Sequence, residues 1–124
     1  MSKEELKEFI KNTREKYKHI RYVECPAFGG EKIYFTKHGF NHLLRKGRIP
    51  RSMDEQIRRL KLLRYVVKII EKNHAFESYR KAEKLNSILH FWSFKKVIAG
   101  KTIFVVICQR NDKPKTFLSI MDKN

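Results

Sequence analysis

The spacing of apolar residues changes once along the chain, and this change constrains the fold more than any other feature. Up to about Lys72, apolar residues recur every three or four positions, which is the period of an amphipathic helix. After Asn73 they alternate with polar residues or run together, which is typical of strands. The sequence therefore predicts an α+β domain in which N-terminal helices pack on one face of a C-terminal sheet.

Three helices are expected before the change. A capping-box pattern predicts a helix over 3–17. A short helix of about three turns is expected to begin after Thr36 and to end at Gly47. A second capping pattern opens the longest helix, which should continue without a break over 52–72 because its apolar stripe is continuous.

The second half of the chain predicts a three- to four-stranded antiparallel β-meander. The segment TIFVVIC, residues 102–108, is apolar on both faces, so we expect it to be a central strand. Two short strands are also expected earlier in the chain, between the first helix and the second. The predicted strands are residues 21–24, 31–35, 76–81, 88–98, 102–109 and 116–121.

Charge is the strongest indication of a partner. The chain has 124 residues, which fits one domain over 1–124, and its 29 Lys and Arg against 13 Asp and Glu give a net charge of +16. Positive charges in such excess repel one another in a compact protein. Binding to a polyanion relieves this repulsion and releases the counterions condensed on the polyanion. We therefore expect a nucleic acid partner, more specifically RNA. An anionic membrane surface, an acidic protein partner or a general solvating coat are the alternatives.

The cysteines and the N-terminus predict a reduced cytoplasmic protein. Neither Cys25 nor Cys108 has a second Cys or His at zinc-finger spacing, and Cys108 lies in an apolar run, where a core thiol is expected. No segment has the length and apolarity of a signal peptide or a membrane span. No metal and no small-molecule cofactor is expected.

The short helix carries the residues best suited to chemistry. His38 and His42 are four positions apart, so both imidazoles should lie on one face, and Arg45 follows three positions later. Imidazoles can transfer protons, and a guanidinium can stabilise the extra charge of a phosphorane-like transition state. These groups suffice to cleave RNA without a metal. The alternatives are a chance pair on a surface helix, or a zinc site that lacks a third ligand.

Basic residues are dense from Lys37 to Lys68, where the only acidic residues are Asp54 and Glu55. Because a solvated helix face normally mixes both signs, this run favours a surface that binds phosphates. In the predicted strand 88–98, aromatic residues between lysines could stack on bases, although such aromatics are more often part of a core. The candidate RNA-binding residues are Lys37, Arg48, Arg51, Arg58, Lys61, Arg64, Trp92, Lys95 and Lys96.

The order of elements resembles the barnase–EndoU–colicin–RelE superfamily of small ribonucleases, in the branch found in phages and polymorphic toxins. The resemblance covers residues 32–121. It depends on a strand ending in Thr36 that enters a helix with His42 and two leucines, and on a final strand that carries Ser119.

This resemblance implies a toxin-like, metal-independent endoribonuclease. The 2′-hydroxyl would attack its own phosphate in tRNA or mRNA, leaving a 2′,3′-cyclic phosphate, and an acidic antitoxin or immunity protein would be the partner. His42 becomes the first candidate for proton transfer, and Ser119 contributes from the sheet. Because fold can persist without activity, the alternative is a non-catalytic RNA- or DNA-binding protein of phage or mobile-element origin.

Overall fold

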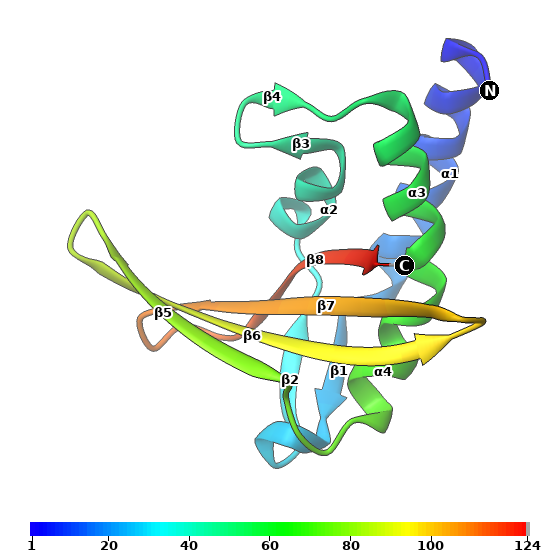
Figure 1. The fold of residues 1–124 in the computed structure, drawn as a ribbon. Coiled ribbons are helices and arrows are strands. Elements are labelled where there is room, and N and C mark those ends of the chain that lie inside the picture. Colours follow the sequence, from blue (N-terminus) through cyan, green and yellow to red (C-terminus); the bar gives the residue numbers. More distant parts are fainter. Residues whose placement is uncertain (124) are drawn as a thin grey trace.

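The computed structural model describes residues 1–123 and has the α+β composition that the sequence predicts. The helices precede most of the strands, as expected (Figure 1). The elements are α1 (Lys3–Ile20), β1 (Tyr22–Cys25), the 3₁₀ turn η1 (Pro26–Phe28), β2 (Glu31–Tyr34), α2 (Lys37–Leu44), β3 (Arg45–Lys46), β4 (Ile49–Pro50), α3 (Met53–Leu62), the 3₁₀ turn η2 (Leu63–Tyr65), α4 (Val66–Lys72), β5 (Ser78–Lys84), β6 (Ser87–Ile98), β7 (Lys101–Arg110) and β8 (Thr116–Lys123).

The main sheet is larger than predicted and is not purely antiparallel. Its strand order is β1-β2-β8-β7-β6-β5, and β2 runs parallel to β8. The predicted three- to four-stranded meander is present as β5 to β8, but the β1–β2 hairpin adds to it through β8. The junction is short: Tyr34 is aligned with Thr116, and the Tyr34 amide donates to the Lys115 carbonyl over 3.0 Å. Beyond Thr116, the edge of β8 that faces away from β7 is covered by α2 and α3 rather than by another strand.

The long helix predicted over 52–72 is interrupted, which corrects the expectation of a continuous helix. It divides into α3 and α4 around the 3₁₀ turn η2. Leu62, Leu63 and Val66 are buried around this turn. α3 packs on α2 and β8, whereas α4 packs on β1 and β6. The interruption therefore lies where the chain changes the elements that it covers.

The short helix also ends earlier than predicted. α2 stops at Leu44, and Arg45 has an extended backbone and begins the two-stranded β3–β4 sheet. Gly47 adopts a φ of 65° in the turn between these strands, a conformation that glycine adopts at little cost. Gly47 thus belongs to a hairpin turn and not to a helix C-terminus. Thr36 does occupy the N-cap position, although its side chain makes no capping hydrogen bond.

Helices cover one face of the sheet more completely than the other. α1, α3 and α4 gather on one side (Figure 1), where Ile103, Val105 and Ile107 of β7 are buried. The alternate β7 residues Phe104, Val106 and Cys108 are only half-buried and point to the other side, which we call the open face. β7 is a central strand, as predicted. Cys108 corrects a prediction, since it is a half-buried free thiol on the open face and not a core residue.

Candidate active site between α2, α3 and β8

His42 lies at the centre of the candidate site, in the last turn of α2. It is half-buried, and its Nδ1 atom is buried without a hydrogen bond to any described residue. Burial, together with the positive charges of Arg51 and Arg59, lowers the pKa of His42 to about 4. The imidazole is therefore neutral at pH 7 and can accept a proton.

Arg51 is held beside His42 by the backbone. It follows the β3–β4 hairpin, and its Nε donates to the His42 carbonyl oxygen over 3.0 Å. Its own backbone amide donates to the carbonyl of Leu44 over 2.8 Å. These two bonds fasten the residue to the C-terminal turn of α2. Arg51 was predicted as an RNA-binding residue, and the structure places it against the candidate base.

Arg59 is the functional candidate that the sequence did not reveal. It is buried, and its guanidinium spans two elements: Nε donates to the Glu55 carboxylate over 2.8 Å, and Nη1 donates to the Ser119 hydroxyl over 2.7 Å. The hydrogen bond from Arg59 lowers the pKa of Glu55, so the carboxylate stays charged. The available signal was the spacing of Glu55 and Arg59, four positions apart on one helix.

Ser119 does not lie at the surface. Its exposed fraction is 1%, and its hydroxyl accepts the hydrogen bond from Arg59. The predicted contribution of Ser119 from the sheet is thus a contact with Arg59, which orients that guanidinium. A bulge between Val106 and Ile107 shifts the register of the β7–β8 pairing next to this serine. We name the group His38, His42, Arg51, Glu55, Arg59 and Ser119 the α2–α3 cluster.

Replacing Ser119 by alanine is expected to lower the free energy of unfolding by about 1–2 kcal/mol, because a charged donor would lose a buried acceptor. Urea denaturation measures the change. The Arg59→Met and Ser119→Ala/Arg59→Met variants complete a double-mutant cycle, in which the double variant should lose less than the sum of the single variants. Additive losses would show that the two side chains are not coupled.

The pKa of His42 also predicts a pH dependence of stability. An unfolded histidine takes up its proton near pH 6.5, whereas the folded one takes it up at about pH 4. Between these values the unfolded state binds more protons, so stability falls as pH drops through the window. At pH 5 the loss from this group is about 2 kcal/mol relative to neutral pH. Urea denaturation at both pH values should show a clearly smaller loss for His42→Gln, and an equal loss in both proteins would contradict the assignment.

Of the other two predicted catalytic residues, Arg45 lies apart from the α2–α3 cluster, whereas His38 lies at its exposed end. Because α2 ends at Leu44, Arg45 is exposed on β3 and does not share a helix face with His42, which corrects the prediction. His38 is exposed one helical turn before His42, and its charge contributes to the lowered pKa of His42. The two histidines therefore lie along the same side of α2, as their spacing predicts.

His38 also borders a groove of about 900 Å³ on the open face of the sheet. Aromatic and aliphatic side chains make up much of the groove, and basic side chains stand among them. Its lining residues are Tyr34, Thr36, His38, Lys84, Leu85, Leu89, Phe91, Cys108, Arg110, Lys113, Pro114, Thr116 and Leu118. α2 thus connects this open-face groove, at His38, with the arginines around His42.

The remaining predicted RNA-binding residues do not form one surface. Lys95 and Lys96 point to opposite sides of β6, and Arg58 forms an ion pair with the buried Asp122 at 2.9 Å. Trp92 is half-buried, with its ring 5.1 Å from the Phe28 ring and 5.0 Å from the Lys115 amine. Lys37, Arg48, Lys61 and Arg64 are exposed on α2, the β3–β4 turn, α3 and η2.

Comparisons with known proteins found no matching family model, no matching curated protein and no matching solved structure. In residues 1–123, no helix has the length and apolarity required to cross a membrane. The same residues contain no group of three His, Cys, Asp or Glu side chains placed to hold a metal ion.

Proposed function

We propose that this protein is a metal-independent endoribonuclease whose active site is the α2–α3 cluster. The observation that carries the proposal is the half-buried imidazole of His42, whose Nδ1 has no hydrogen-bond partner among the described residues and whose pKa is held low by burial and by nearby arginines. A neutral base in a positively charged environment suits a reaction in which a proton leaves and negative charge develops on a phosphate.

The proposed reaction is an intramolecular transfer. The 2′-oxygen of a ribose bonds to the adjacent phosphorus as His42 accepts the 2′-hydroxyl proton, while Arg51 stabilises the charge on the phosphoryl oxygens. The bond from phosphorus to the 5′-oxygen then breaks, and His38 donates a proton to that oxygen. The products are a 2′,3′-cyclic phosphate and a free 5′-hydroxyl.

Substrate binding strengthens the base. A bound phosphodiester would place negative charge near Arg51, whose positive charge adds to burial in depressing the pKa of His42, so the pKa should rise in the complex. His42 is then neutral before the RNA binds, and its affinity for a proton increases once the RNA has bound. The proposal places the RNA along α2, with a neighbouring base in the open-face groove against Phe91.

We extend the proposal to the family that the sequence resembles. As a member of the barnase–EndoU–colicin–RelE superfamily, the protein would act as a toxin in the cytoplasm, cut tRNA or mRNA, and be neutralised by an acidic partner. In this proposal the buried hydrogen bond from Arg59 to Ser119 has a structural role, because it joins α3 to β8. The net charge of +16 supports RNA over a small-molecule substrate.

The test is a cleavage assay with purified protein, total tRNA and a long mRNA in the presence of EDTA. We expect defined fragments that end in cyclic phosphate. Intact RNA that still shifts on a gel, with an affinity that falls steeply as salt rises, would contradict the enzyme and leave a non-catalytic RNA-binding protein. Cleavage that EDTA abolishes would contradict the metal-independent mechanism.

Arg51 and Arg48 form a matched pair for this assay. Both are arginines on the β3–β4 segment, but only Arg51 contacts His42. Arg51→Ala should lower the cleavage rate about 100-fold, since it removes a donor aimed at the developing charge. Arg48→Ala removes the same charge from an exposed turn and should change the rate less than about threefold. Equal effects would show that only net charge matters.

A further inference from the structure

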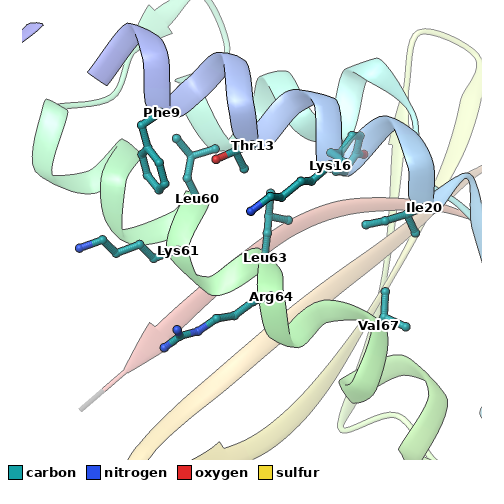
Figure 2. Close-up of a pocket in the computed structure, with 10 residues that line it drawn as sticks. Phe9, Thr13, Lys16, Ile20, Leu60, Lys61, Leu63, Arg64 and Val67 are labelled. Carbon is teal, nitrogen blue, oxygen red and sulfur yellow. The ribbon is translucent and has the colours of Figure 1, made fainter. Parts of the chain in front are cut away.

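A second groove lies on the helical side of the molecule, away from the open face. It has a volume of about 640 Å³ and separates α1 from α3, η2 and α4 (Figure 2). Phe9 and Ile20 of α1 border it on one side, and Leu60, Leu63 and Val67 border it on the other. The groove is therefore an apolar channel between two helical walls.

The wall formed by α1 is incompletely packed. Of its 18 residues, Leu6 and Tyr17 are buried, whereas Phe9, Ile10 and Ile20 are only partly covered. From Phe9 to Ile20 the helix rises about 17 Å, which is three turns. A channel of this length between two helices accepts the apolar stripe of a third helix.

The rim of the groove is basic. Lys16, Lys61 and Arg64 project along it, and none of the lining residues is acidic (Figure 2). All three side chains are exposed, and none forms an ion pair with residues 1–123. A helix that filled the channel would place its flanking positions next to these cations. Acidic residues at those positions would be favoured, and basic ones would be repelled.

We propose that this groove is the docking site for an amphipathic helix of a partner protein, with an apolar stripe that enters the channel and acidic residues on both flanks. The shape of the channel calls for a helix, and the three cations of the rim call for acidic flanks. The docking site does not depend on RNA cleavage, because none of its lining residues belongs to the α2–α3 cluster.

The probe is a designed helical peptide of about 15 residues, with leucine at helical spacing on one face and glutamate elsewhere. A peptide of the same composition in scrambled order has the same charge but no apolar stripe. Fluorescence anisotropy at physiological salt should show binding of the amphipathic peptide and at least tenfold weaker binding of the scrambled one. Equal binding of both peptides, or no binding of either, would overturn the proposal.

Charge-reversal variants locate the site. Lys16→Glu/Lys61→Glu/Arg64→Glu should weaken peptide binding at least tenfold. The matched variant Lys11→Glu/Lys68→Glu/Lys72→Glu changes the net charge equally at exposed positions outside the groove, and should weaken binding less than about threefold. Thermal denaturation checks that both variants fold. Equal losses in the two variants would overturn the proposal.

Two other occupants are distinguishable. A second copy of the chain in the groove would make the protein sediment as a dimer, and the rim variant would sediment as a monomer. RNA in the groove would make the rim variant lose tRNA affinity far more than the matched variant. Either outcome would replace the acidic helix as the occupant, whatever the cleavage assay shows.

Discussion

His42→Ala is expected to lower the rate of RNA cleavage about 1,000-fold, within the range that general base catalysis contributes. In the proposed mechanism the neutral imidazole is the base of the α2–α3 cluster, and alanine leaves nothing there to accept the 2′-hydroxyl proton. Arg51 remains to bind the phosphate in the proposed mechanism, so RNA affinity should change far less than the rate. Single-turnover cleavage and gel-shift titration measure the two quantities separately.

Two variants accompany this measurement. His42→Gln keeps a polar side chain of similar size without a base, and it should lose as much activity as alanine while retaining the fold. His19→Ala removes an exposed histidine from α1 and should leave the rate unchanged. Normal cleavage by His42→Gln would show that the ring is not the base, and the proposed mechanism would fail.

Gly39→Ala is expected to lower the free energy of unfolding by about 3 kcal/mol, the upper end of the range typical of overpacking. Helical glycine is usually replaced by alanine with a gain of up to about 1 kcal/mol, so the sign is inverted here. The cause is the approach of α2 to β8: a Cβ atom at Gly39 would lie 2.4 Å from the Phe117 carbonyl oxygen and 3.0 Å from the Tyr17 hydroxyl oxygen.

Urea denaturation measures this effect, with Asn41→Ala as the control on the exposed side of the same helix. The control should change stability by no more than about 0.5 kcal/mol. If Gly39→Ala were neutral, α2 would have room to move away from β8. Since α2 carries both histidines, that result would also remove the structural basis for a fixed site.

The parts of the fold that local pattern determines were predicted from the sequence. Apolar, β-branched and aromatic runs bounded by turns placed β6, β7 and β8 within one or two positions of their ends, and the Ser2 capping box is present at the start of α1. Tertiary packing decided the rest. The interruption at Leu63–Tyr65 lies where α3, packed on β8, gives way to α4, packed on β1, and the parallel pairing of β2 with β8 joins residues about 80 positions apart. No local sequence pattern indicates either the interruption or the pairing.

In the candidate site, too, local spacing predicted some features and tertiary packing determined the others. Four-residue spacing predicted that His38 and His42 share one side of α2, since that property belongs to a single helix. Arg59 could not be inferred, because its burial depends on Ser119, which lies 60 positions later. Arg45 was placed wrongly because the helix was expected to continue through a segment that forms the β3–β4 hairpin instead.

The position of β8 has a consequence for the order of events during synthesis. β8 is the last strand of the described residues, yet it lies between β2 and β7 and is the strand that connects the β1–β2 hairpin to the other three strands of the main sheet. A ribosome therefore completes every other strand before the one that joins them. Until Ser119 has left the exit tunnel, Arg59 has no partner on the sheet and α2 lacks the surface of β8 on which it packs. The proposed RNA-cleaving centre therefore assembles only after β8 has emerged from the ribosome.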